Sequence, residues 1–470
     1  MPMPCVKVAE GLLLFGRQLR EGTMDRKTFL GEVDVKDNGF RDAGDELGAI
    51  GHKRGLAFFD SSTRGQLHFG PGAGLAIGVS LGRGSLRATI VDANGELHCP
   101  VEGRALPGQF ALHPDELLDR IRDVVGAVLE AGLSKRSLLV DGALPLLGVS
   151  VAWSVPVGRE GMPLGPALRH RSWRDGAPLQ HRVAQHLNVP PERSHAMNDS
   201  HAAAIAVAWD QTRAEDHLTQ AHARIGIVVR VSGGISGASI IVNPSQHATG
   251  VGRTSGFATS VLIGGNDYHA GELGHLPVDR EIIERLNRDR PDGLRPLVAH
   301  RCSCTTSDPP PNHLEAYAAT PALMHRVLEV VPDTHAAECE AVRGVIANPA
   351  TPVNRRALAD VGELVGHALL GPVAMMNPAT VTMTGSFAVP VVCQAVDRYL
   401  GRSTVLGAPP KVIWPDPETN RFIRAQGAAL AVLREHVHRR FKVLLGGAKQ
   451  GAAPRVAQLT LPVDDLPWRH

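Results

Sequence analysis

Residues 75–97 read LAIGVSLGRGSLRATIVDANGEL and contain two β-rich segments separated by a glycine-rich turn. Valine, isoleucine and threonine favour extended backbone, and Asn94-Gly95 supplies a second turn. A further strand and glycine turn follow at residues 224–234 (RIGIVVRVSGG), and SGASIIVN continues the pattern at 236–243. These stretches predict strands joined by tight turns, and therefore a fold with β-sheets at its centre.

Helical segments alternate with strands along the rest of the chain. Residues 114–132 have the apolar spacing of an amphipathic helix, and the strand-like LLGVSVAWSV follows at 146–155. Late in the chain, ATVTMTGS at 379–386 is a strand that ends in a glycine turn, and residues 421–437 again have helical spacing. This alternation predicts an α/β fold with mixed or parallel sheets covered by helices.

Length, charge and cysteine content limit the class of protein. A chain of 470 residues is too long for one ordinary core, so two or three domains are expected. The 49 basic and 47 acidic residues leave a formal charge of +2, which provides no global field for capturing nucleic acid or an acidic membrane. Six cysteines without regular spacing, no signal-peptide pattern and no long uninterrupted apolar run predict a reduced, cytoplasmic protein with no membrane span.

A histidine in AGELGH, a C-x-C pair and a second histidine have the residue types of a closed zinc site. They are His275, Cys302, Cys304 and His313. Zinc prefers thiolate sulfur and imidazole nitrogen in a tetrahedron, and two cysteines one residue apart reach one ion only from a tight, non-helical knuckle. The alternative is two buried thiols and two unrelated surface histidines. On the residues alone, both interpretations stay open.

Between about residues 70 and 440 the chain carries a series of motifs in a fixed order. They are residues 75–97, SVAWSVPV, MNDSHAAAIA, GGISGASIIVN, AGELGHLPV, CSC followed by HLEAYA, MNPATVTMTGS and RAQGAALAVL. In this order they resemble the ROK family of repressors, open reading frames and sugar kinases. The resemblance implies a two-lobed actin-like ATPase fold with a sugar between the lobes and a structural zinc in the larger lobe. The family's zinc set is usually one histidine and three cysteines, so here His313 stands in place of the third cysteine.

The resemblance also implies a domain organisation. Residues 71–197 correspond to the small α/β lobe, and residues 198–418 correspond to the large α/β lobe with the zinc site. A helix at about 419–440 returns to the small lobe. Residues 441–470 are predicted to be a C-terminal tail.

The resemblance further implies a sugar site with a catalytic base. Its residues are Asn198, Asp199, Glu272, His275 and Glu315. By resemblance Asp199 is the general base that accepts the proton of the attacking sugar hydroxyl, and Asn198 fixes a neighbouring hydroxyl. The MNDSHAAA motif and the NHLEAY segment each have a structural alternative. Asn198 or Asp199 caps the helix that begins at Ser200, and Asn312 with Glu315 forms a capping box.

The two phosphate loops distinguish this sequence from a working kinase. Where the family's first loop reads D-x-G-G-T, residues 80–84 read SLGRG, so the carboxylate is lost and Arg83 occupies a glycine position. Loss of that carboxylate weakens phosphoryl transfer and makes ATP and magnesium doubtful cofactors, whereas Arg83 suits a phosphate. The second loop, SGGISG at 232–237, either cradles phosphates or is a tight turn. The candidate phosphate-binding residues are Gly82, Arg83, Gly84, Gly233, Gly234, Gly237 and Gly385.

The first 70 residues distinguish the repressors of the family from its kinases. Three short helices and a hairpin formed by RGLAFFD and QLHFG resemble the repressors' winged-helix domain, although the candidate recognition helix at 37–47 is acidic. Basic residues that could still contact a DNA backbone are Arg17, Arg20, Arg26, Lys27, Lys53, Arg54 and Arg64.

These features predict a sugar-responsive transcriptional regulator that binds a sugar or sugar phosphate, operator DNA and further copies of itself. Two alternatives concern the site between the lobes. One is an ATP-dependent sugar kinase with Asp199 as its base, and the other is a repurposed ROK-fold enzyme. A third alternative concerns the N-terminal residues, which would then serve only in packing or dimerisation.

Overall fold

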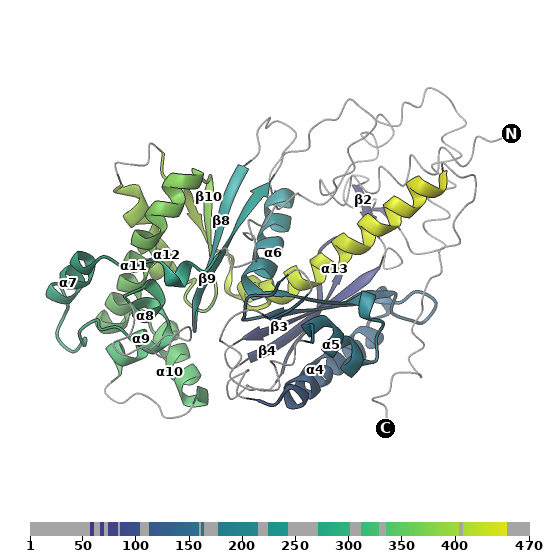
Figure 1. The fold of residues 1–470 in the computed structure, drawn as a ribbon, viewed down its shortest axis with the longest axis horizontal. Coiled ribbons are helices and arrows are strands. Elements are labelled where there is room, and N and C mark those ends of the chain that lie inside the picture. The colour runs from purple at the N-terminus through teal and green to yellow at the C-terminus, as the bar shows by residue number, and fades with distance from the viewer. Residues whose placement is uncertain are drawn as a thin grey trace.

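The computed structural model describes residues 57–60, 66–69, 74–82, 85–103, 112–158, 161–163, 177–214, 224–242, 271–300, 312–328, 335–403 and 408–448. These residues form two lobes, each built around one β-sheet, with helices α6 (Asp199–Ala214) and α13 (Pro417–Ala448) between the sheets (Figure 1). Strands β1 (Ala57–Asp60) and β2 (Gln66–Phe69) form the predicted antiparallel hairpin. The helices predicted ahead of this hairpin lie outside the described residues.

The smaller lobe contains a five-stranded mixed sheet in the order β5-β4-β3-β6-β7. Its strands are β3 (Leu75–Gly82), β4 (Ser85–Asp92), β5 (Leu97–Glu102), β6 (Leu146–Trp153) and β7 (Ser194–Asn198). The first three are antiparallel neighbours, whereas β6 and β7 continue the sheet in the direction of β3. Strand β3 is buried along its whole length because it lies at the centre of the sheet.

Helices cover both faces of this sheet. On one face, α4 (Pro114–Ser134) and α5 (Leu179–Leu187) form a single core with the strands. Leu117, Ile121 and Val128 repeat at helical spacing along α4, and all three are buried in that core. Helix α13 packs on the opposite face, against β3, β4 and β6. Two short 3₁₀ segments, η3 (Arg136–Leu138) and η5 (Pro191–Arg193), complete the lobe.

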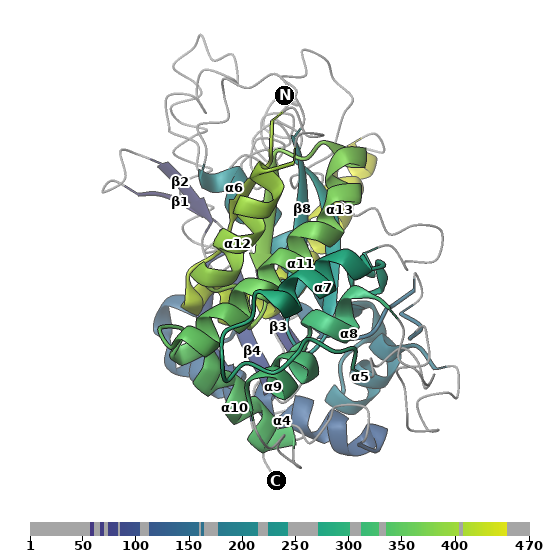
Figure 2. The same cartoon turned by 90° about the vertical axis from the view of Figure 1, so that its left-hand side faces the viewer.

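The larger lobe contains a four-stranded sheet in the order β11-β10-β8-β9. Its strands are β8 (Arg224–Val231), β9 (Ile235–Val242), β10 (Thr380–Thr384) and β11 (Lys411–Ile413). Strands β8 and β9 form an antiparallel hairpin, and β10 runs parallel to β8 and β11. Helices α11 (Pro352–Met376) and α12 (Pro390–Gly401) pack side by side on this sheet (Figures 1 and 2). The other elements are η7 (Leu273–His275), α7 (Arg280–Arg288), α8 (Leu314–Ala318), α9 (Thr320–Val327) and α10 (His335–Ala347).

Helices α6 and α13 pack closely against each other and against the small-lobe sheet. A Cβ atom on Gly427 of α13 would lie 1.7 Å from the carbonyl oxygen of Ala202 in α6. A Cβ atom on Gly78 of β3 would lie 1.8 Å from the carbonyl oxygen of Ala425 in α13. Only glycine permits such approaches of two backbones. The helix pair contributes to one core that also contains residues of β3, β8 and β9, so it joins the two lobes.

Replacing Gly427 by alanine should destabilise the protein, because the added methyl group meets backbone rather than a movable side chain. Overpacking of this kind costs about 1–3 kcal/mol. The matched control is Gly126→Ala in α4, where a Cβ atom meets nothing within 4 Å. Alanine there should leave the stability unchanged or raise it by up to about 1 kcal/mol. Denaturant unfolding of the full chain measures both free energies, and equal values for the two variants would contradict the close packing.

The predicted strands and helices of both lobes are present. The helix predicted at 421–437 is longer, because α13 continues to Ala448 and includes the start of the predicted C-terminal tail. Among the described helices, α11 alone is long and apolar enough to cross a membrane by length and composition. It packs on α12 and the large-lobe sheet, so its apolar side chains are part of a protein core. The boundaries assigned to the domains stay a prediction.

Candidate functional site

Asp199 lies where the two lobes and helix α13 meet. Strand β7 pairs in parallel with β6 and ends at Asn198, so Asp199 begins α6 at the carboxyl edge of the small-lobe sheet. This edge is where open α/β sheets usually bind ligands. Asp199 is 1% exposed and Asn198 is 8% exposed. The chain therefore buries a carboxylate at the junction between the lobes.

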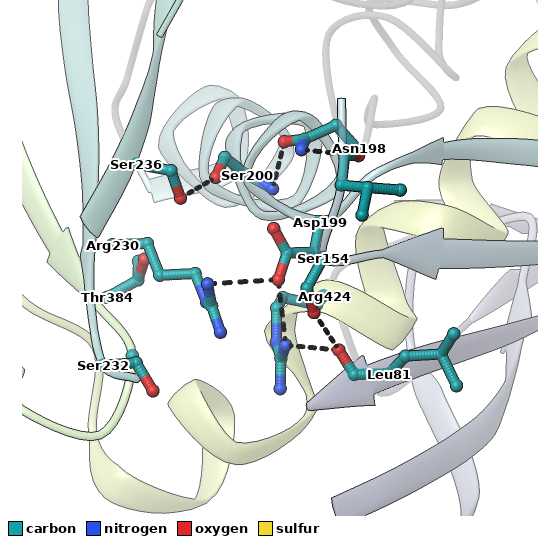
Figure 3. Close-up of polar contacts among 12 residues, drawn as sticks. Leu81, Ser154, Asn198, Asp199, Ser200, Arg230, Ser232, Ser236, Thr384 and Arg424 are labelled. Carbon is teal, nitrogen blue, oxygen red and sulfur yellow. Dashed lines mark hydrogen bonds and ion pairs between the residues drawn. The ribbon is translucent and has the colours of Figure 1, made fainter. Parts of the chain in front are cut away.

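Two buried arginines, which we call the arginine pair, hold the carboxylate of Asp199 (Figure 3). Arg230 Nη1 lies 3.1 Å from Asp199 Oδ2, and Arg424 Nη1 lies 3.2 Å from the same oxygen. Arg424 Nη1 also donates to the carbonyl oxygen of Leu81 at 3.0 Å, and Ser154 Oγ donates to that carbonyl at 2.9 Å. Since Arg230 belongs to β8 and Arg424 to α13, one carboxylate links the large-lobe sheet to the helix that packs on the small-lobe sheet.

The arginine pair brings more positive charge than Asp199 balances. Arg230 is 7% exposed and Arg424 is 9% exposed. Burial, and secondly the charge of Arg230, lower the pKa of Arg424 to about 9, whereas Asp199 acts to raise it. Within the described part of the chain, Arg230 Nε has no hydrogen-bond partner. Two guanidiniums share one carboxylate, so among the residues that the structure describes one positive charge of this cluster has no carboxylate of its own. Buried ions are costly unless they are paired.

Sequence reasoning did not find the arginine pair. It identified Asp199 from the MNDSHAAA motif, and the arginine that it singled out was Arg83, which lies outside the described residues. A signal was nevertheless present. Arg230 interrupts an apolar strand directly before a glycine turn, and Arg424 lies among the small residues of RAQGAALA. Arginine is seldom buried without a partner, so a charge at such positions indicates a partner elsewhere in the chain.

Asn198 makes the capping contacts of the structural alternative. Its Oδ1 accepts a hydrogen bond from the N–H of Ser200 at 2.8 Å, and its Nδ2 donates to the carbonyl oxygen of Val155 at 3.0 Å. These bonds fix the start of α6. The hydroxyl of Ser200 is hydrogen-bonded to that of Ser236, which ties α6 to β9. Asp199, in contrast, directs its carboxylate to the arginine pair and not to its own helix.

Two further carboxylates, Glu272 and Glu315, lie on the large-lobe side of the site. An isolated β-bridge brings the AGELGH segment against the NHLEAY segment, which carries Glu315. Glu315 Oε2 accepts a hydrogen bond from the N–H of Ile235 at 3.2 Å. Burial raises the pKa of Glu272 to about 7, with additional contributions from Glu315 and Asp199. The three carboxylates therefore influence one another at the same junction.

The capping-box alternative for Asn312 and Glu315 is wrong. Helix α8 has His313 as its N-cap residue, without a capping hydrogen bond from that side chain. Asn312 Nδ2 instead donates to the carbonyl oxygen of Val278 at 2.8 Å. A Cβ atom on Gly234 would lie 3.1 Å from Glu315 Oε2, so this carboxylate lies against the glycine turn between β8 and β9.

That glycine turn contains Gly233 and Gly234. The N–H of Ser232 donates to the carbonyl oxygen of Gly234 at 2.9 Å, which closes a tight turn. Gly237 lies beyond the turn, in strand β9, and donates its N–H to the carbonyl oxygen of Gly271 at 2.6 Å. The assignment of Gly237 to a phosphate loop is therefore not supported, because its backbone donor already holds the AGELGH segment against the sheet.

The other candidate phosphate residues lie at two strand ends. Gly82 is the last residue of β3, whereas Arg83 and Gly84 lie outside the described residues. Gly385 follows β10 with φ of +92°, a conformation that glycine adopts readily. Its N–H donates to Asn420 Oδ1 at 3.0 Å, and its carbonyl oxygen accepts from Asn420 Nδ2 at 2.8 Å. Helix α13 therefore holds this turn at the junction.

Two solved structures resemble the chain in fold. A ROK family glucokinase from Streptomyces griseus, in complex with glucose and AMPPNP, aligns with a TM-score of 0.51 and 17% identity, over 76% of this chain and 99% of that one. A ROK family transcriptional regulator, a homolog of the E. coli MLC protein, aligns with a TM-score of 0.55 and 13% identity, over 94% of this chain and 100% of that one. The chain has the ROK fold. The predicted two-lobed actin-like architecture is thereby confirmed. No family model and no curated protein matches the sequence.

Two of the four predicted zinc ligands lie together in the large lobe of this ROK fold. The rings of His275 and His313 are stacked, with centroids 5.1 Å apart and planes 7° apart. His313 Nδ1 lies 2.8 Å from the carbonyl oxygen of Gly274, so Nδ1 carries the proton in this contact. Cys302 and Cys304 lie outside the described residues, which by themselves gather no cluster of three metal ligands. The histidine pair fits one half of the predicted site.

The zinc site stays a prediction. Protein purified without chelator should contain about one zinc ion per chain, and Cys302→Ser should remove it and lower the thermal midpoint, because structural zinc contributes folding free energy. The control is Cys99→Ser, since Cys99 lies in β5 of the other lobe. A zinc-free wild-type protein in metal analysis would contradict the site. Full zinc content in His313→Ala would remove only that residue from the ligand set.

Proposed function

We propose that this ROK-fold protein binds a sugar between its lobes and works as a sugar-responsive transcriptional regulator, not as a kinase. The observation that carries the proposal is the pairing of Asp199 with Arg230 and Arg424. A general base in phosphoryl transfer must accept the proton of the attacking hydroxyl. Asp199 is buried, and its Oδ2 already accepts from both guanidiniums, so only its Oδ1 is left to accept a proton from a substrate hydroxyl.

The sequence of the first phosphate loop supports the same proposal. Magnesium-assisted phosphoryl transfer relies on carboxylates that hold the metal and on donors that stabilise the developing charge. Residues 80–84 read SLGRG and contain no carboxylate. The first loop therefore lacks the metal-binding carboxylate, and the two arginines on Oδ2 of Asp199 further disfavour the kinase reaction.

A sugar would bind on the acidic side of the junction. Glu272 and Glu315 supply carboxylate oxygens from the large lobe, and His275 lies beside them in AGELGH. Carboxylates accept hydrogen bonds from vicinal hydroxyl groups, which gives selectivity for sugars without any chemistry. Asn198 is the weakest of the proposed ligands, because its amide is already engaged at the start of α6.

The regulator assignment extends to the N-terminal residues. The ROK family transcriptional regulator aligns over 94% of this chain, whereas the ROK family glucokinase aligns over 76%. We therefore assign the first 70 residues to a winged-helix-like domain that binds operator DNA in a cytoplasmic homo-oligomer. Two DNA-binding modules on one oligomer would raise the effective affinity, which would compensate for the acidic sequence at 37–47.

An ATP-dependent sugar kinase is the second candidate. The glycine turn at Gly233 and Gly234 is the feature that favours it, since the N–H of Gly385 already donates to Asn420. Such turns can present backbone N–H groups to phosphates. A repurposed ROK-fold enzyme would use the same turn for another ligand.

Full-length protein should shift duplex DNA from its own upstream region at low salt, and a sugar ligand should change that affinity. Binding should weaken steeply as salt is raised, because it depends on phosphate contacts from basic N-terminal residues. Arg54→Gln combined with Arg64→Gln should weaken the shift, whereas Arg280→Gln, at an 88% exposed position in α7, should leave it unchanged. The absence of a shift, with and without sugars, would contradict regulation by DNA binding.

A further inference from the structure

The uncompensated charge of the arginine pair lies beside polar groups that nothing in the proposed function uses. Figure 3 shows Arg230, Ser232 and Thr384 to the left of Asp199, and Arg424 below it. The hydroxyl of Ser232 accepts a hydrogen bond from Ser386 Oγ at 3.0 Å, next to the turn that follows β10. Arg230 Nε has no partner within the described residues. The buried guanidinium of Arg230 and the half-buried hydroxyl of Ser232 therefore lie where β8 and β10 end.

The charged groups around Asp199 divide the junction into a basic end and an acidic end. Arg87 of β4 adds to the positive charge felt by Arg424, and its own partner is Glu102 at 2.8 Å. The acidic end consists of the two large-lobe carboxylates described above, Glu272 and Glu315. A ligand that spans this junction meets opposite charges at its two ends.

We infer that the ligand of this junction is a sugar that carries an anionic group, either a phosphate monoester or a carboxylate, and that Arg230 and Arg424 receive this group. The inference rests on the proposed function, because the sugar ring is assigned to Glu272 and Glu315 at the acidic end. The inference adds the chemical class of the ligand, because the positive charge of Arg230 and Arg424 requires an anionic group. A neutral sugar would leave the buried charge of the arginine pair uncompensated.

Guanidinium groups are well suited to this role. Each presents five N–H donors in a planar fork that matches the oxygens of a phosphate or carboxylate. Asp199 occupies one Nη1 of each arginine, so further donors remain on both side chains. A magnesium-bound nucleotide is a poorer match, because the first loop has no carboxylate to hold the metal.

The test measures binding of glucose, glucose 6-phosphate, glucuronate and inorganic phosphate to the full-length protein by calorimetry. Glucose 6-phosphate or glucuronate should bind at least about tenfold more tightly than glucose, because charge-assisted hydrogen bonds are strong in a buried site. Arg230→Gln should abolish this preference and keep Asp199 paired with Arg424, which protects the fold. Arg230→Lys should retain part of the preference, and the surface variant Arg280→Gln should retain all of it.

The comparison between the two charged sugars identifies the anion, since a preference for one over the other separates phosphate from carboxylate.

Equal affinities for glucose and both charged sugars would overturn the inference and leave the proposed function standing. A preference for glucose 6-phosphate that survives Arg230→Gln would also overturn it. If none of these sugars, nor mannose or N-acetylglucosamine, bound at all, the proposed function itself would fail. Inorganic phosphate binding as tightly as glucose 6-phosphate, and unaffected by Arg230→Gln, would indicate an anion site elsewhere and contradict the inference.

Discussion

Asp199→Asn is expected to lower the free energy of unfolding by about 3–5 kcal/mol, the usual cost of removing one partner from a buried ion pair. The reason is the arginine pair, since asparagine keeps the shape of Asp199 but leaves Arg230 and Arg424 without a counter-charge. Both guanidiniums are buried, so water replaces the lost carboxylate only in part. Denaturant unfolding of the full-length protein, monitored by circular dichroism, gives the value.

Two further variants isolate the cause. Asp123→Asn changes an exposed aspartate of α4 and should alter the stability by less than about 0.5 kcal/mol. Arg424→Met added to Asp199→Asn removes one of the uncompensated charges and should restore part of the loss, which a double-mutant cycle measures. A catalytic base held under functional strain would behave in the opposite way, because its neutralisation commonly stabilises an enzyme. Unchanged or increased stability of Asp199→Asn would therefore contradict the role of counter-ion.

Much of the fold could be predicted from local sequence. Residues 75–97 became strands β3 and β4 because β-branched residues and glycine turns determine local backbone conformation. The helix at 114–132 followed from its apolar spacing, and the ROK resemblance supplied the order of the elements. The length of α13 was underestimated, because the apolar spacing continues beyond Val437 with Phe441, Leu444 and Leu445, and the helix extends to Ala448.

The site was predicted only in part, for a physical reason. Asp199, Glu272 and Glu315 could be named because each lies in a short motif. The partners of Asp199 come from β8 and α13, and no local pattern records that these elements meet at the start of α6. The same limit applies to backbone contacts. Gly237 resembles a loop residue in SGGISG, yet it lies within strand β9, where it pairs with Val229 of β8.

The central claim is that Asp199 neutralises the arginine pair and does not act as a base, so the junction binds a sugar without phosphorylating it. The most direct measurement is a kinase assay. Full-length protein is incubated with ATP, magnesium and a panel of hexoses and amino sugars, and the sugar phosphate formed per chain is quantified. Calorimetry on the same sample confirms that the sugar binds. Sugar kinases commonly turn over at about 1–100 s⁻¹. We predict binding with turnover at least about a thousandfold slower than that range, and unchanged in Asp199→Asn. Turnover at about 1 s⁻¹ or faster that Asp199→Asn abolishes, while the variant stays folded, would contradict the account.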